Sequence, residues 1–265
     1  MDQMAVASFF LQSIRLYLNS QNSKMLAENI ADKQRSVGLM FDQIAHSYDF
    51  LNHFLSFGTD RLWRRKAVKS LSGKHSCPEI LDVATGTGDL AIESLRLGPK
   101  HVTGIDISGN MLKAGREKIA RAGLSDKIEL LSVESEKIGF PEKSFDIAMS
   151  SFGVRNFADT LAGLREMARV LRNGGHIMIL EFSRPSGFPF NQLYRLYFLH
   201  ILPFIGRIFS KSKNAYRYLP DTVMSFPENE EFMALLRNAG FSELRQQRLS
   251  GGIASIYTGI IFKMQ

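Results

Sequence analysis

The chain has 265 residues, a formal net charge of +7 and one cysteine. A single thiol excludes an internal disulfide framework and a cysteine-rich zinc site, so we expect a reducing compartment and no metal centre. With 45% hydrophobic residues, the composition is too apolar for a disordered chain and sufficient for one large core with an added cap. The excess of Lys and Arg suits nucleic acid, an anionic membrane surface or a phosphate-bearing ligand.

The first 36 residues precede the region of regular patterning. Ala5–Leu18 is apolar, but polar residues interrupt it, which makes a poor secretory signal, and it is too short to span a bilayer as one helix. We expect residues 1–36 to form a poorly ordered extension, with an amphipathic helix that touches a membrane as the alternative. Residues 37–265 are predicted to form one domain, with a helical cover at 37–75 and a cap insert at 184–227.

From residue 79 onward, short apolar runs alternate with helical patterns, which indicates βαβ units around a parallel sheet. Strands are predicted at 79–83, 101–106, 127–133, 145–151 and 176–182, and helices at 90–97, 109–122 and 230–239. Apolar residues from Leu161 to Leu171 predict a further helix, which should stop at Asn173-Gly174-Gly175 in a left-handed C-cap. Two last runs, 244–249 and 256–262, should form an antiparallel pair. The predicted fold class is α/β, with a seven-stranded, mostly parallel sheet, an antiparallel last strand and a helical cap insert.

A glycine-rich turn follows the first predicted strand. Gly86-Thr87-Gly88 would place backbone N–H groups at the carboxyl edge of the sheet, where a polar ligand could bind. Asp106 ends the second strand, where its carboxylate could accept hydrogen bonds from both hydroxyls of a ribose. Two plainer interpretations stay open, namely a simple tight turn and an N-cap at Asp106, although Ser108 is better placed to cap. The spacing also fits the dinucleotide fingerprint, so a nicotinamide enzyme is a competing hypothesis.

Asp82, at the end of the first strand, separates these two ligand hypotheses. Its carboxylate would repel a pyrophosphate but suits a ligand with a positive end, such as the ammonium and sulfonium groups of S-adenosylmethionine. Four segments, 81–88, 104–108, 145–149 and 171–175, resemble the motif series of class I methyltransferases in order and spacing. The resemblance implies a Rossmann-like class I fold that uses S-adenosylmethionine as methyl donor.

The residues after the fourth predicted strand limit the methyl acceptor. An enzyme that methylates exocyclic amines of nucleic acid should carry an Asp/Asn-Pro-Pro-aromatic turn there, whereas this chain has Ser150 to Asn156. A cytosine-ring enzyme needs a cysteine near that edge, but Cys77 precedes the first strand. We therefore predict that nucleic acid is not a partner.

Several longer segments carry a second, closer resemblance. They include 41–49, 61–64 and 218–221, together with Phe152-Gly-Val-Arg-Asn156 and Leu180-Glu-Phe-Ser-Arg-Pro185. From about Val37 to its end, the chain resembles the ubiquinone/menaquinone biosynthesis C-methyltransferase family. The resemblance implies methylation of a ring carbon of a polyprenylated quinol, such as demethylmenaquinol to menaquinol, and of the benzoquinol of the ubiquinone pathway as a further substrate.

The same resemblance implies individual cofactor contacts. They fall on Thr87, Asp106, Glu134, Ser135 and Ser151, and Asp82, Gly86 and Gly88 complete the predicted cofactor site. The family usually has Asn-Ala-Glu where this chain has Glu134-Ser-Glu136, which leaves backbone contact at Ser135 as the firmer expectation. The family's His before Arg-Leu-Trp is Asp60 here, so no catalytic role is expected at that position.

The predicted catalytic residues follow from the chemistry of a quinol. A ring carbon becomes nucleophilic when a neighbouring hydroxyl loses its proton, so the site needs a base or a cation that stabilises the phenolate. Arg155 could hold this anion and Asn156 could orient the ring oxygen or a water. Tyr48 is expected to line the site and Asp49 to assist proton removal. The competing structural role for Arg155 is a salt bridge with a nearby acid such as Asp159.

Two acid-free stretches carry the positive charge. Residues 61–78 and 182–220 contain six Lys and Arg each, and aromatic residues are interleaved in the second stretch. This composition suits a cap that covers an apolar substrate at a membrane, or single-stranded nucleic acid. We expect a cytoplasmic protein bound peripherally to the inner face of an anionic membrane, with Arg207, Lys211 and Lys213 contributing to binding.

Other functions stay open at this point. The closest alternative enzyme methylates another apolar acceptor, such as a sterol or a phospholipid amine. A nicotinamide oxidoreductase is the third enzyme considered, and an RNA-binding scaffold with a methyltransferase-like fold is the non-enzymatic alternative. The sequence leaves the oligomeric state undetermined, with a homodimer as one form considered.

Overall fold

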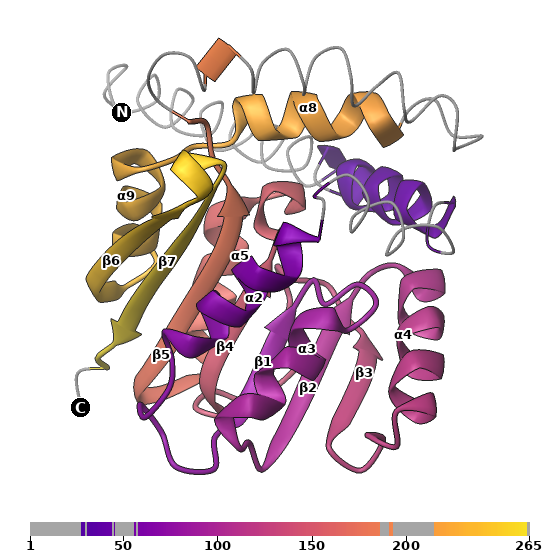
Figure 1. Cartoon of the computed structure of the whole chain (residues 1–265), viewed down its shortest axis with the longest axis vertical. Coiled ribbons are helices and arrows are strands. Elements are labelled where there is room, and N and C mark those ends of the chain that lie inside the picture. The colour runs from indigo at the N-terminus through magenta and orange to yellow at the C-terminus, as the bar shows by residue number, and fades with distance from the viewer. Residues whose placement is uncertain are drawn as a thin grey trace, which may run out of the picture.

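The computed structural model describes residues 28–29, 31–43, 45, 56, 58–185, 191–192 and 215–263. Within these residues, a seven-stranded sheet has the order β3-β2-β1-β4-β5-β7-β6 (Figure 1). Its strands are β1 (Glu79–Val83), β2 (His101–Asp106), β3 (Ile128–Ser132), β4 (Phe145–Ser151), β5 (Leu171–Phe182), β6 (Phe241–Leu249) and β7 (Ala254–Ile261). Neighbours from β3 to β5 are parallel, whereas β7 is antiparallel to both β5 and β6. The predicted α/β class, the mostly parallel sheet and the antiparallel last strand are confirmed.

Helices cover both faces of the sheet. They are α2 (Thr59–Lys69), α3 (Asp89–Ser94), α4 (Gly109–Arg121), α5 (Thr160–Val170), α8 (Ala215–Ser225) and α9 (Glu230–Asn238). One apolar layer joins α2, α3 and α4 to one face through buried side chains such as Trp63, Leu90 and Leu112. A second layer joins α5 and α9 to the other face through Leu164 and Phe232. Because both faces are buried, the carboxyl ends of the parallel strands are the natural place for a site.

Helix α5 ends earlier than the sequence predicts. Its last residue is Val170, because Leu171 is extended, with φ −74° and ψ 143°, and pairs with Phe145 of β4. Gly174 has the predicted positive φ, 76°, but it lies in the irregular first part of β5 rather than at a helix C-cap. Regular pairing with β4 resumes at His176, so strand pairing displaces the predicted helix end.

A helix over residues 31–43 lies beside the start of α4 (Figure 1). Asp42 accepts hydrogen bonds from the Ser108 hydroxyl, at 2.6 Å, and from the Asn110 backbone, at 2.9 Å. Lys33 Nζ donates to the Phe157 carbonyl at 2.7 Å. The helix therefore continues across the boundary that the sequence places between residues 36 and 37, and polar contacts tie it to the sheet domain.

The described part of the 184–227 cap insert is mainly α8. This helix lies over the carboxyl edge of the sheet (Figure 1), whereas residues 193–214 are outside the described ranges. Among the helices that the structure describes, none combines the length and the apolar character needed to cross a membrane.

Candidate active site

The turn after β1 forms part of an open pocket at the carboxyl edge of the sheet. Gly86 and Gly88 adopt φ values of 58° and 80°, which glycine reaches without strain. The pocket measures about 910 Å³ including the space open to solvent, and small-molecule sites typically have such volumes. Of the predicted cofactor residues, five line it, namely Gly86, Thr87, Asp106, Ser135 and Ser151.

Asp106 connects the turn after β1 to the start of α4. Its Oδ2 accepts a hydrogen bond from the Gly86 N–H and its Oδ1 accepts one from the Ser108 N–H, both at 2.9 Å. Burial raises the pKa of Asp106, and the backbone hydrogen bonds oppose that rise. Ser108, not Asp106, caps α4, because its hydroxyl accepts from the Met111 N–H. Each carboxylate oxygen of Asp106 keeps a lone pair, so two ribose hydroxyls can still donate to it.

Asp82 is not among the residues that line the pocket, so its predicted contact with the cofactor stays a prediction. Its side chain lies inside the sheet at 1% exposure, where Oδ2 accepts a hydrogen bond from the Thr85 hydroxyl at 2.6 Å. Among the described residues Oδ1 has no hydrogen-bond partner. Burial raises the pKa of Asp82 from 3.8 to about 7. A cation bound near the turn would therefore stabilise the ionised Asp82 carboxylate by Coulombic attraction, without touching it.

Two further predicted cofactor residues lie outside the pocket lining, so their contacts stay predictions. Glu134 is exposed and is not part of the pocket lining, which instead includes Ser135 and Glu136. Gly88 is also outside the lining, and it serves as the left-handed N-cap residue of α3.

Glu136 is a site residue that the sequence did not single out. Its Oε1 accepts hydrogen bonds from the Ala158 and Asp159 N–H groups, and its Oε2 accepts from Gln34 and from Ser135. It therefore joins three segments around the pocket. The sequence contained only a weak signal for Glu136, namely the departure from the family pattern two residues earlier, at Glu134.

The predicted catalytic arginine forms a buried ion pair. Arg155 lies in the short helix η2 (Val154–Asn156), directly after β4, and its Nη1 is 2.7 Å from Oε1 of Glu181 in β5. The two side chains are only 5% and 1% exposed. Nη1 also donates to the Phe152 carbonyl, while Nε has no partner among the described residues. The predicted alternative partner, Asp159, caps α5 instead.

An aromatic wall surrounds this ion pair. The rings of Phe152 and Phe182 lie 4.5 Å apart, and Trp63 from α2 contacts both at centroid distances of 6.2 and 6.3 Å. The Arg155 guanidinium carbon lies 5.3 Å from the centre of the Phe182 ring. Phe152 also adopts a positive φ of 57°, a strained conformation for a bulky residue of the kind that gathers at functional sites. The three rings are tilted against one another and form an apolar surface beside a fixed cation.

Of the two predicted catalytic residues that the structure describes, Asn156 lines the pocket and Arg155 does not. The Oδ1 of Asn156 is buried without a hydrogen-bond partner among the described residues. The structure thus brings Asn156 to the same pocket as the predicted cofactor turn, with Arg155 next to it in η2. Tyr48 and Asp49 lie outside the described residues, so their roles stay predictions.

The α2 helix contributes Arg64, which the sequence did not assign. Its guanidinium lines the pocket and pairs with Asp60 at 2.5 Å and with Asp89 at 3.0 Å. Asp60 is buried, so its carboxylate serves this pair.

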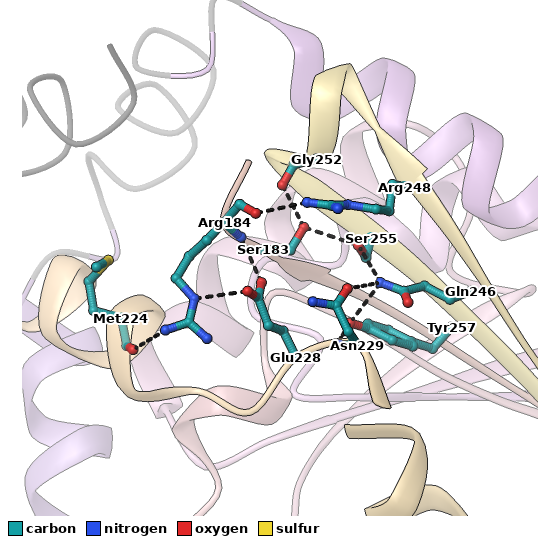
Figure 2. Close-up of polar contacts among 10 residues, drawn as sticks. All are labelled: Ser183, Arg184, Met224, Glu228, Asn229, Gln246, Arg248, Gly252, Ser255 and Tyr257. Atoms are coloured by element: carbon teal, nitrogen blue, oxygen red, sulfur yellow. Dashed lines mark hydrogen bonds and ion pairs between the residues drawn. The ribbon is translucent and has the colours of Figure 1, made fainter. Parts of the chain in front are cut away.

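The cap is anchored next to the site by one arginine at the end of β5. Arg184 donates from its backbone N–H and from Nε to the Glu228 carboxylate, at 2.7 and 3.0 Å. Its Nη1 donates to the Met224 carbonyl at 3.0 Å, and the Arg184 carbonyl accepts a hydrogen bond from Arg248 Nη2 at 2.8 Å. Figure 2 shows Arg184 reaching between Glu228 and Met224. The C-terminal end of α8 is therefore held against β5 and β6.

These residues fit S-adenosylmethionine. Asp106 offers acceptors for ribose hydroxyls, Gly86 and Thr87 line the adjoining turn, and the unpartnered oxygen of buried Asp82 favours a cation near the turn. No cluster of three or more His, Cys, Asp or Glu able to hold a metal occurs among the described residues. The fold and the site together define an S-adenosylmethionine-dependent methyltransferase.

Solved structures support the fold. A SAM-dependent methyltransferase from Thermotoga maritima matches with a TM-score of 0.59 at 21% identity, covering 84% of this chain and 99% of that one. A SAM-dependent methyltransferase from Aquifex aeolicus matches with a TM-score of 0.54 at 22% identity, covering 75% and 89%. At these identities the similarity concerns the fold alone.

Sequence relatives define the family. The family model described as ubiE/COQ5 methyltransferase family matches residues 28–261. The chain is 46% identical over 232 residues to the ubiquinone/menaquinone biosynthesis C-methyltransferase of Geotalea daltonii, covering 87% of this chain and 98% of the relative. It is 43% identical over 231 residues to the demethylmenaquinone methyltransferase of Bacteroides fragilis, covering 87% and 94%. The chain therefore belongs to the ubiE/COQ5 methyltransferase family, and the predicted family is confirmed.

Proposed function

We propose that this chain transfers the methyl group of S-adenosylmethionine to a ring carbon of a polyprenylated quinol, converting demethylmenaquinol to menaquinol. The observation that carries the proposal is the buried Arg155–Glu181 pair against an aromatic wall at the edge of the cofactor pocket. The names of the relatives from G. daltonii and B. fragilis supply the substrate class. The benzoquinol of the ubiquinone pathway is the second substrate to be tested.

The side chains perform the steps that make the ring reactive. Arg155 holds the phenolate that forms when a quinol hydroxyl loses its proton, because Glu181 fixes the guanidinium in place. The Asn156 amide orients the ring oxygen or a water, and Phe152 and Phe182 keep bulk water away from the anion. S-adenosylmethionine supplies an electrophilic methyl group. The ring carbon would accept this methyl group as the methyl–sulfur bond breaks, with S-adenosylhomocysteine as the leaving group, and loss of the proton from that carbon would restore the aromatic ring. Tyr48 and Asp49 stay candidates for lining the site and for removing the first proton.

The partner surface is the second part of the proposal. Helix α2 turns Arg61, Leu62, Arg65, Lys66 and Lys69 to solvent, and Leu62 is 58% exposed. The single acid of this helix is Asp60, which is buried against Arg64, so the outer face of α2 carries only positive charge. A cationic helix face with an exposed leucine suits the surface of an anionic membrane, where a polyprenylated quinol resides.

Quinone profiling tests the enzymatic part. A strain that lacks this chain should accumulate demethylated quinone, and the wild-type sequence should restore the methylated form. The Asp106→Ala variant should fail to restore it, because cofactor binding is lost. An unchanged quinone profile in the deletion strain would refute the assignment. Single-stranded RNA binding with steep salt dependence and no methyl transfer would support the scaffold alternative instead.

Liposome sedimentation tests the membrane part. The variant Arg61→Gln/Arg65→Gln should bind anionic vesicles about 30-fold more weakly, since each basic residue near the surface contributes about 1 kcal/mol. The matched control is Arg121→Gln/Lys127→Gln, which removes two exposed charges at the end of α4 and before β3. Equal binding by both variants, or binding that is indifferent to salt, would contradict a role for the α2 face.

A further inference from the structure

One hydroxyl group on the cap lacks a role in the structure as it stands. The Tyr218 Oη, on α8, is buried and has no hydrogen-bond partner among the described residues. A buried polar group without a partner costs free energy, and native chains rarely keep one without a ligand, a water or a catalytic role. A phenylalanine would fill the same space without that cost.

The surroundings of this hydroxyl belong to the active site. Helix α8 packs against η2, which carries Arg155 and Asn156. Burial raises the pKa of the Tyr218 phenol, and the Arg155 guanidinium is near enough to oppose that rise. Tyr218 therefore keeps its proton at neutral pH and can donate it in a hydrogen bond.

Three polar atoms without a partner among the described residues lie on α8 and η2, the two elements that pack together between the cap and the sheet. Besides Tyr218 Oη, they are Nε of Arg155 and Oδ1 of Asn156, all buried and without a hydrogen-bond partner among the described residues. Tyr218 Oη and Arg155 Nε are donors, which suits a ring oxygen that bears negative charge. Asn156 Oδ1 is an acceptor, which suits a neighbouring hydroxyl or water that donates. Glu181 holds the guanidinium through Nη1, which leaves Nε for another acceptor.

We propose that Tyr218 is a further catalytic residue, whose hydroxyl donates a hydrogen bond to the quinol oxygen that Arg155 stabilises. This inference rests on the proposed function. Arg184 ties the end of α8, the helix that carries Tyr218, to β5 through Glu228 and Met224 (Figure 2). The site then surrounds the developing phenolate from the sheet side, with Arg155, and from the cap side, with Tyr218.

The test is the Tyr218→Phe variant in a methyl-transfer assay with reduced demethylmenaquinone. We expect kcat to fall by about 100-fold, the size of loss seen when one donor to a developing anion is removed. S-adenosylhomocysteine affinity should stay unchanged, because Tyr218 is not part of the pocket lining around Asp106. The acidic limb of the pH–rate profile should move to higher pH, because the phenolate loses a stabilising donor.

Tyr257→Phe is the matched control. Its hydroxyl is bonded to the Asn229 N–H, at 3.0 Å, and to Gln246, at 3.2 Å, away from the pocket lining. This variant should unfold at a lower temperature but keep its kcat within a few-fold and its pH profile in place. Tyr218→Phe should keep its unfolding temperature, since it removes an unpaired hydroxyl.

Two results would overturn the inference by itself. They are wild-type kcat in Tyr218→Phe, and a loss of kcat with an unmoved pH profile, which would indicate packing alone. A wild-type protein that binds S-adenosylhomocysteine but does not methylate the quinol would instead overturn the proposed function, and this inference with it.

Discussion

Arg155 and Glu181 form an ion pair of 2.7 Å in which both side chains are almost fully buried. Removing one member would leave an uncompensated buried charge, whereas replacing both removes the charges together. Arg155→Met alone should therefore lower the free energy of unfolding by about 3–5 kcal/mol. The double variant Arg155→Met/Glu181→Leu should recover most of that stability.

Activity should not follow this recovery. If Arg155 stabilises a phenolate, both the single and the double variant should lose quinol methylation by a factor of about 100 or more. Chemical denaturation and single-turnover assays on the same preparations separate the two effects. Recovery of activity in the double variant would show that the pair is structural only.

Asp106 should control cofactor affinity. Asp106→Asn weakens the two charge-assisted hydrogen bonds from the Gly86 and Ser108 N–H groups. It also replaces one of the two oxygens that can accept hydrogen bonds from the ribose hydroxyls. Since a hydrogen bond to a charged group contributes about 1.5–3 kcal/mol, the Kd for S-adenosylhomocysteine should rise by about 100-fold in calorimetry. Asp146→Asn is the control, because Asp146 accepts from the Glu79 N–H and from Arg172 outside the pocket. Similar losses in both variants would argue against a specific role for Asp106.

Asp82 should make the stability of the ligand-free protein depend on pH. Its pKa is raised from 3.8 to about 7 in the folded state by burial, so between these values the folded chain holds a proton that the unfolded chain has released. The contribution of Asp82 to the free energy of unfolding should therefore be present in full below about pH 4. It should be lost as the pH rises through 7, which lowers the free energy of unfolding by on the order of 4 kcal/mol.

The variant Asp82→Asn isolates this effect, because an amide does not titrate. The difference in unfolding free energy between wild type and Asp82→Asn, measured from pH 4.5 to 8, should change steadily in favour of the variant. A difference that stays constant across that range would mean that Asp82 titrates normally.

The Arg184–Glu228 contact should set the position of the cap. Glu228→Gln removes the charge that holds Arg184 against the end of α8, so Tyr218 should lose its position over the site. We expect a lower kcat for quinol methylation and an unchanged Kd for S-adenosylhomocysteine. Glu230→Gln is the matched control, since its pair with Arg237 is exposed and exposed pairs contribute little. Equal activity in both variants would contradict a positioning role for Glu228.

Much of the fold follows from local sequence patterns. The apolar runs at β1, β2 and β4 are bounded by turn residues, and the predicted bounds of these strands match the structure. The glycine turn after β1 and Asp106 after β2 converge because parallel strands end at one edge of the sheet. Predictions that depend on a single strand and its following turn therefore succeeded.

Predictions that depend on long-range pairing were less complete. Arg155 pairs with Glu181, 26 residues away in the adjacent strand, while the nearby Asp159 that the sequence suggested caps a helix. Glu136 was missed for the same reason, because its partners Gln34 and Ala158 come from distant segments. The sequence placed Asp82 correctly in β1. It could not show that the side chain is buried and bonded to the Thr85 hydroxyl, because the alternation of side chains along a strand does not tell what packs over each face.

Direct methyl transfer to a reduced quinol tests the central claim. The purified chain, with S-adenosylmethionine labelled in the methyl group and demethylmenaquinone in detergent micelles, should place label on the quinone ring when a reductant is present. The oxidised quinone should not be labelled, because its ring lacks the hydroxyl that makes the neighbouring carbon nucleophilic. Ring-labelled menaquinol only under reducing conditions is the result that the account predicts. Absence of label on the reduced quinol, from a preparation that binds S-adenosylhomocysteine, would contradict it.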